Sequence, residues 1–228
     1  MAAMLRAQLE TKPGPVLVRV EHGNVAGWDD VLEVAHGSDG RESETRWQVK
    51  RQTTELEAEV IVKLLEELRD HHSFCGCLVL RDLVAVRGMG ELRVLRDLSE
   101  RAKTGDPETL ITTGTADELT WITKLATELA LGQREVLVLL GRFAIKTANE
   151  SDLRRLAEGD LHVICPSDPA GAFEAIHSYL ALNPDGAIRY TASFLRETVL
   201  RDKPLVMPKS DHVRRMAELG LEIPSFSP

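Results

Sequence analysis

An amphipathic stretch between residues 54 and 70 is the feature that most constrains how this chain can fold. Its apolar residues recur at steps of one, three and four, which places them on one face of a helix. They are Leu56, Val60, Ile61, Leu64, Leu65 and Leu68. Thr54, with Glu57 three residues later, fits a capping box. We therefore expect a helix that begins near Thr54 and runs to about Asp70.

Strand-like runs lie on both sides of this helix. They cover residues 16–20, 30–35, 45–51 and 75–80. The first is rich in β-branched residues and the last is a short apolar run typical of a buried strand. Residues 37–40 form a strong turn signal between the second and third runs, which predicts a hairpin. The order of elements over this part of the chain is therefore strand-strand-strand-helix-strand.

The rest of the chain also alternates between helical and strand-like patterns. Met4, Leu5 and Leu9 are compatible with one or two helical turns at the start, and Thr115 with Glu118 fits a second capping box. We expect further helices at residues 92–102, 115–129, 151–157, 170–180 and 188–200, and buried strands at 136–140 and 161–164.

A breaker cluster, Gly105-Asp106-Pro107, suggests a boundary between two parts. We expect a core at residues 1–104 and a smaller accessory α/β region at 105–204, for oligomerisation or partner docking. Residues 205–228 have little periodicity and read as a linker or tail. A length of 228 residues agrees with one large domain or two small ones.

Composition excludes several classes of protein. The longest purely aliphatic run has five residues, at 136–140, and the chain opens without a secretory signal pattern. Three cysteines are too few for a disulfide framework, so we expect a cytoplasmic protein with reduced thiols and no membrane segment. The formal charge of −8 argues against broad nucleic-acid binding and leaves room for a local basic cleft.

Three polar residues on two neighbouring strands carry the strongest chemical signal. Strand side chains alternate between faces, so Gln48 and Lys50 point the same way, and Asp30 begins the neighbouring strand of the predicted hairpin. A carboxylate and a carbonyl oxygen are hard ligands that suit Mg²⁺ or Mn²⁺. An ammonium beside them can orient a water or offset charge on a phosphate. The trio predicts metal-assisted phosphodiester hydrolysis.

The pattern Asp…Gln-x-Lys on this frame resembles the PD-(D/E)xK, or restriction-endonuclease-like, nuclease superfamily in its Gln-x-Lys variant. The closer resemblance is to the double-stranded DNA endonuclease domain of bacterial anti-phage effectors, including the CD-NTase-associated endonucleases. The matching positions are Glu21, Asp29-Asp30-Val31 and Gln48-Val49-Lys50, within roughly residues 15–80.

The resemblance implies a fold, a reaction and residue roles. The fold is an α/β restriction-endonuclease-like core with a mixed sheet flanked by helices. The reaction is hydrolysis of DNA phosphodiesters with Mg²⁺ or Mn²⁺. Asp30 resembles the metal-binding aspartate, although Asp29 could take that role. Gln48 resembles the second metal-facing residue, Lys50 the catalytic lysine and Glu21 an auxiliary acid of the metal site.

The remaining expectations concern partners and alternatives. Arg46 and Arg51 are candidate DNA contacts, in a segment with a modest basic excess. We expect double-stranded DNA as a partner, a homo-oligomer, and a sensor module on a separate segment or protein. The first alternative is a catalytically inactive nuclease fold that docks a protein or binds DNA without cutting. An ordinary solvent-facing strand at 45–51 and a small-molecule binder using the second half are further alternatives.

Overall fold

The computed structural model describes residues 1–10, 14–20, 27–28, 30–37, 39, 41–50, 54–183 and 188–207. Its strands are β1 (Gly14–Val20), β2 (Val31–His36), β3 (Glu42–Lys50), β4 (Phe74–Leu80), β5 (Ala85–Val86), β6 (Gly90–Glu91) and β7 (Phe143–Thr147). Its α-helices are α1 (Ala2–Glu10), α2 (Ala58–Asp70), α3 (Leu92–Ala102), α4 (Pro107–Thr113), α5 (Ala116–Leu129), α6 (Gln133–Leu140), α7 (Glu150–Ile164), α8 (Pro169–Leu182) and α9 (Ala192–Phe194). A short π-helix at Leu195–Val199 follows α9.

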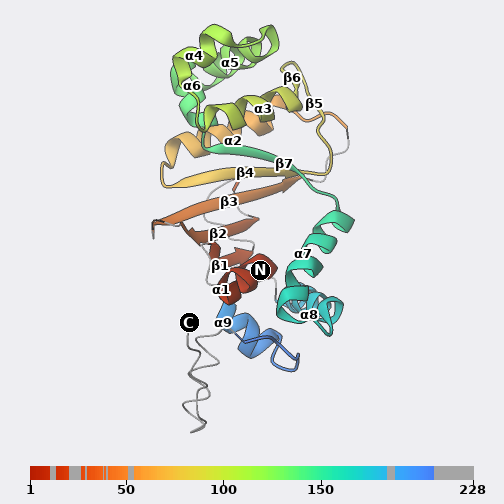
Figure 1. Ribbon diagram of the computed structural model, residues 1–228. Coiled ribbons are helices and arrows are strands. Elements are labelled where there is room, and N and C mark those ends of the chain that lie inside the picture. The colour runs from red at the N-terminus through yellow and green to blue at the C-terminus, as the bar shows by residue number, and fades with distance from the viewer. Residues whose placement is uncertain are drawn as a thin grey trace.

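A five-stranded mixed sheet in the order β1-β2-β3-β4-β7 organises the molecule (Figure 1). The first three strands are antiparallel neighbours, whereas β3, β4 and β7 run parallel to one another. Parallel neighbours need a crossover connection, and α2 provides it between β3 and β4. The predicted strand-strand-strand-helix-strand order and the β2–β3 hairpin are both confirmed.

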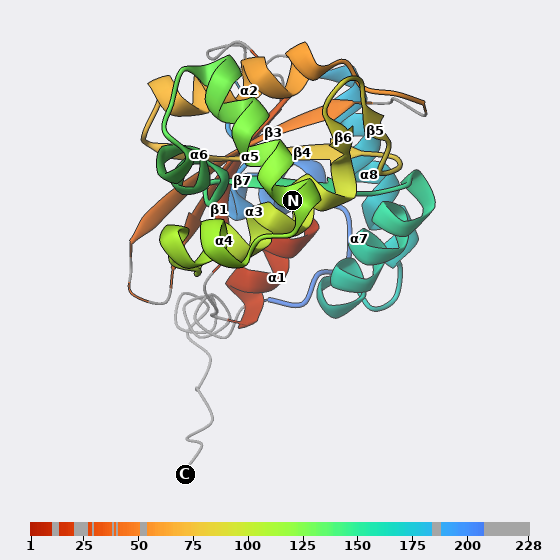
Figure 2. The ribbon, with the colours of Figure 1, turned by 90° about the horizontal axis from the view of Figure 1, so that it is seen from above.

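Helices cover the sheet in two groups, and each group closes its own apolar core (Figure 1). One core joins α2, α3, α5 and α6 to inward side chains of β4 and β7, such as Leu78 and Phe143. The other joins α1, α7, α8 and the α9 segment to β1, with Val18 and Tyr190 fully packed. In the view from above, α7 and α8 lie beside each other and away from α4 and α6 (Figure 2). Since strand side chains alternate, each face of the sheet contributes to a different core.

Two apolar runs that predict buried strands are helical, so those predictions are wrong. Residues 136–140 belong to α6, in which Val136, Leu137, Leu139 and Leu140 are buried while Val138 is 59% exposed. This spacing is a helix face, and a five-residue apolar run does not distinguish it from a strand. Residues 161–164 form the last turn of α7, which buries its apolar residues at a spacing of three. The strand that joins the sheet after α6 is β7, which the sequence analysis does not predict.

Smaller differences concern the ends of elements. The Thr54 capping box is wrong, because α2 begins at Ala58 and its N-cap, Glu57, makes no side-chain cap hydrogen bond. Leu56 instead pairs with Val86 as an isolated bridge, so its backbone is extended. The Thr115 capping box is confirmed. α4 was not predicted, and the helical part of 188–200 is limited to α9 and the π-helix.

The first core contains residues from both sides of position 104, from Trp28 to Ile145. The division of the chain into two parts at position 104 stays a prediction. Residues from both predicted parts pack together in this one apolar core. None of the helices in the described ranges is both long and apolar enough to cross a membrane. Most of the predicted tail, from residue 208 onward, lies outside the described residues.

Trp28 fastens the start of β2 to the first core. Its side chain is fully buried, and its Nε1 donates a hydrogen bond to the carbonyl oxygen of Leu64 on α2 at 2.9 Å. The ring lies over Gly76 on β4, where an added Cβ would overlap it. Edge-to-face contacts with Phe74 and Phe143 complete the pocket. The segment that leads into β2 is therefore held against two other elements.

We expect Gly76→Ala to destabilise the protein by about 1–3 kcal/mol, because the new methyl group displaces the Trp28 ring. Urea denaturation followed by circular dichroism measures this change. Gly159→Ala is the matched control, since Gly159 lies inside α7 and a Cβ there meets nothing within 4 Å. Alanine there is expected to stabilise the helix by roughly 0.5–1 kcal/mol. Equal effects of the two substitutions would contradict the role of Gly76.

Candidate functional site

Asp30 and Gln48 are in direct contact where β2 begins and β3 ends. Val31 pairs with Trp47 in the antiparallel register, so the next pair outward is Asp30 with Gln48, and their side chains share a face. Gln48 Nε2 donates a hydrogen bond to Asp30 Oδ2 at 2.7 Å, and the backbone amide of Val49 donates to the same oxygen at 2.5 Å. The carboxylate is therefore fixed against β3 by two donors.

Only the Nε2 group of the Gln48 carboxamide has a hydrogen-bond partner among the described residues. Its side chain is 4% exposed, and Oε1 has no hydrogen-bond partner among the described residues. A buried acceptor without a partner costs about 1–3 kcal/mol relative to a satisfied one. Most buried polar atoms in proteins are paired, so this carbonyl oxygen requires an explanation.

Lys50 lies two residues beyond Gln48 on β3 and therefore on the same face. Its neighbour across the parallel ladder is Leu80, the last residue of β4, and Leu80 pairs in turn with Thr147, the last residue of β7. The half-buried Lys50 ammonium forms no ion pair with any described residue. Asp30 and Gln48 are thus in contact, and Lys50 lies on the same face at the next inward-facing position of β3.

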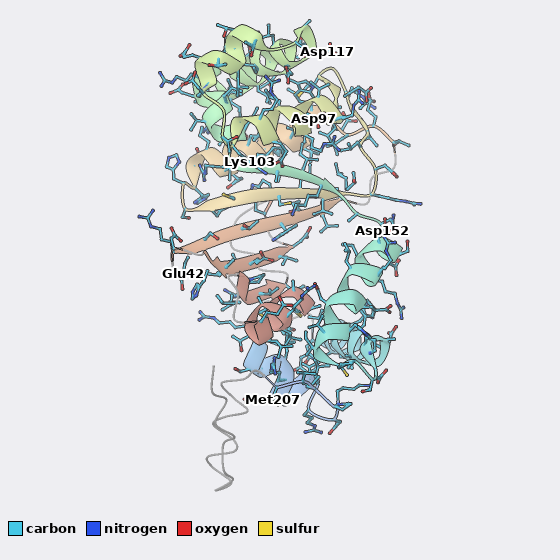
Figure 3. All side chains as sticks on the ribbon, in the orientation of Figure 1. Glu42, Asp97, Lys103, Asp117, Asp152 and Met207 are labelled. Atoms are coloured by element: carbon cyan, nitrogen blue, oxygen red, sulfur yellow. The ribbon has the colours of Figure 1, made fainter. Side chains whose placement is uncertain are left out.

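The edge of the sheet at Lys50 is formed by the carboxyl ends of three parallel strands. The backbone amide of Ala148 donates to the carbonyl oxygen of Leu80, so the chain turns there before α7 begins. Figure 3 labels Glu42, at the opposite end of β3, and Asp152, in the first turn of α7. Gln48 and Lys50 lie at the end of β3 away from Glu42, because β3 runs from Glu42 to Lys50.

The donor set fits a hard divalent cation in part. The two hydrogen bonds to Asp30 use Oδ2, and no described residue donates to Oδ1. That oxygen and the unpaired Gln48 Oε1 are of the carboxylate and carbonyl types that Mg²⁺ or Mn²⁺ prefers, but Gln48 directs Nε2, not Oε1, at Asp30. Within the described ranges no cluster of three or more His, Cys, Asp or Glu side chains surrounds a metal position. Glu21, the predicted auxiliary acid, lies outside the described residues, as do Asp29 and Arg51.

Arg46 occupies a different position from the trio. Its side chain is 12% exposed, its Nε donates to Glu44 at 2.6 Å, and its guanidinium stacks over the ring of Phe74. An arginine held in this way helps to pack the sheet face. Its predicted contact with DNA stays a prediction.

Cys77 lies on β4 beside Trp47 but serves as packing. Burial raises the pKa of its thiol to about 11, so the sulfur is protonated at neutral pH and is not a ready ligand or nucleophile. The ammonium of Lys146 on β7, on the far side of β4, lies over the ring of Trp47 at 4.7 Å from the ring centroid. This pair is not predicted from the sequence because β7 is not predicted, although the apolar alternation of Phe143 and Ile145 is a signal for a strand.

The fold is similar to that of a solved protein, the Moraxella osloensis Cap4 SAVED/CARF-domain containing receptor. The two chains are 11% identical with a TM-score of 0.52, and the match covers 88% of this chain and 46% of the receptor. This chain therefore corresponds to about half the length of that protein. No protein-family model matches the sequence, and no curated protein matches it either. At this identity the likeness concerns the fold.

A double-mutant cycle tests the contact between Asp30 and Gln48. Asp30→Ala removes the acceptor and leaves the buried Gln48 amide unpaired, so we expect a loss of about 1–3 kcal/mol of unfolding free energy. Gln48→Leu removes both the donor and the unpaired oxygen, and is expected to cost far less. The double variant should cost less than the sum, with a coupling energy of about 1 kcal/mol in urea denaturation. Strict additivity would show that the two side chains do not interact.

Proposed function

We propose that this chain is a divalent-metal-dependent endonuclease that hydrolyses phosphodiester bonds of double-stranded DNA as an effector of bacterial anti-phage defence. The observation that carries the proposal is the Asp30–Gln48 pair with its buried, unpaired carbonyl oxygen, and Lys50 two residues away on the same face. In the proposal the core is restriction-endonuclease-like, which agrees with the mixed sheet and with α2 between β3 and β4.

Each residue of the trio has a distinct task in this proposal. Asp30 and Gln48 would hold the cation, with Glu21 as the auxiliary acid. A bound Mg²⁺ or Mn²⁺ supplies polarisation of the phosphodiester and a bound water of lowered pKa. Lys50 orients the attacking water and offsets the negative charge that grows on the phosphate. The half-buried setting of Lys50, without a competing carboxylate in the described ranges, leaves its ammonium available for this task.

The biological setting is inferred from two similarities. The sequence resembles the endonuclease effectors of anti-phage systems, and the fold is similar to part of the Cap4 SAVED/CARF-domain containing receptor. Because the match covers 46% of that receptor, an activating sensor module on another segment or chain belongs to the proposal. Homo-oligomerisation, DNA contacts by Arg46 and Arg51, and a cytoplasmic location remain further parts of it.

A second function is favoured by the same hydrogen bonds. Asp30 Oδ2 is occupied by Gln48 and by the backbone of Val49, which joins the start of β2 to β3. A carboxylate with these two hydrogen bonds can stabilise the fold without any part in catalysis. The alternative is therefore a catalytically inactive nuclease-fold module that docks a protein or binds DNA without cutting.

Plasmid cleavage in the presence of Mg²⁺ or Mn²⁺ separates the two functions. We expect the wild-type protein to convert supercoiled plasmid to linear product, and Asp30→Ala and Lys50→Ala each to lower the rate by about 100-fold or more. EDTA is expected to stop the reaction. Gel electrophoresis of the products over time measures the rates.

Lys63→Ala is the matched control for Lys50→Ala. Lys63 is exposed on α2 and pairs only with Glu59 of the same helix, an interaction worth little to stability. Cleavage that survives both site substitutions would rule out this site. Absence of cleavage by the wild-type protein with either metal ion would favour the docking module.

A further inference from the structure

We propose that the orientation of the Gln48 carboxamide controls cation binding at the candidate site. The site is closed while Nε2 donates its hydrogen bond to Asp30, and it opens when the carboxamide rotates and directs Oε1 toward the cation. The inference rests on the cation site of the proposed function and adds a regulatory role for one side chain. In the closed arrangement Nε2 faces the carboxylate and Oε1 faces away, buried and unpaired among the described residues.

The closed arrangement is the one that the chain favours without a cation. With Oε1 turned toward Asp30, two acceptors would face each other, and the carboxylate would lose the stronger, charge-assisted hydrogen bond. The amide therefore presents its donor to Asp30 and leaves its own acceptor unsatisfied. A positive charge beside Asp30 reverses this preference, because carbonyl oxygen is a ligand for Mg²⁺ and an amide N–H group is not.

The backbone allows Gln48 to turn while Asp30 stays in place. The amide of Val49 donates to Asp30 Oδ2 independently of the Gln48 side chain. The carboxylate therefore keeps one anchor when the carboxamide rotates about its terminal bond. Because the Gln48 side chain is 4% exposed, bulk water does not readily replace the lost partners, so the two orientations are distinct states.

We call the Gln48–Asp30 hydrogen bond, with its rotatable carboxamide, the clasp. The Gln48→Glu substitution distinguishes this clasp from an amide that only stabilises the fold. Glutamate offers no donor to Asp30, so two carboxylates repel each other at the edge of the sheet when no cation is present. The same two carboxylates form a better cation site, since affinity for hard divalent ions rises with the charge of the ligands. We therefore expect lower thermal stability in EDTA together with tighter binding of Mn²⁺.

The experiment measures Mn²⁺ binding by isothermal titration calorimetry and melting temperature by differential scanning fluorimetry, with no DNA present. We expect Gln48→Glu to bind Mn²⁺ on the order of tenfold more tightly than the wild-type protein. Its melting temperature should be lower than the wild-type value in EDTA and should rise more on addition of Mn²⁺.

Two further variants supply the controls. Asp30→Asn combined with Gln48→Glu exchanges the amide and the carboxylate, and is expected to restore the melting temperature in EDTA without the gain in affinity. Gln133→Glu adds the same charge on α6, at an exposed position far along the chain, and should change neither quantity. Mn²⁺ affinity of Gln48→Glu no higher than that of the wild-type protein, or an equal gain in Gln133→Glu, would overturn the inference.

This result is independent of the cleavage assay. Tighter Mn²⁺ binding by Gln48→Glu, combined with no DNA cleavage by the wild-type protein, would support the clasp and refute the nuclease. Cleavage that depends on Asp30 and Lys50, combined with unchanged Mn²⁺ affinity in Gln48→Glu, would support the nuclease and refute the clasp.

Discussion

The packing of Trp28 against Gly76 is the contact on which the candidate site depends. The chain enters β2 through Trp28, and Asp30 follows two residues later. The indole of Trp28 is fixed on one side by β4 and on the other by its hydrogen bond to α2. Only a glycine on β4 leaves room for the ring. The position of the Asp30 carboxylate is therefore set by apolar packing, and its direction by the donors on β3.

Much of the first half of the fold could be predicted from the sequence because its patterns are unambiguous. The α2 stripe has the spacing of a helix over 13 residues, and the turn at residues 37–40 indicates a hairpin. The second half is less predictable, because the run at 136–140 is as compatible with a buried strand as with a short helix. Only the packing of α6 against α3 and α4, which lie some way before it in the chain, decides between them.

The candidate site also combines features that local sequence patterns predict with features that depend on the packing of other elements. Alternation along β3 places Gln48 and Lys50 on one face, and the hairpin brings Asp30 opposite Gln48, so the meeting of the three residues follows from local pattern. The burial of Arg46 does not follow from it. Its guanidinium is covered by Phe74, the first residue of β4, which pairs with Glu44 across the parallel ladder, and that pairing depends on the α2 crossover. Nor does any pattern indicate which end of the Gln48 carboxamide faces Asp30.

The choice of an amide at position 48 has opposite consequences for folding and for cation binding. An acid beside Asp30 would strengthen a cation site and weaken the sheet edge whenever the cation is absent, since a half-buried carboxylate pair repels itself. An amide satisfies Asp30 without a cation, at the cost of one unpaired buried oxygen. A chain with Gln48 can therefore fold with β2 and β3 joined at this edge before any metal binds. In the proposed function, such an arrangement would keep the candidate site closed until a cation favours the open carboxamide.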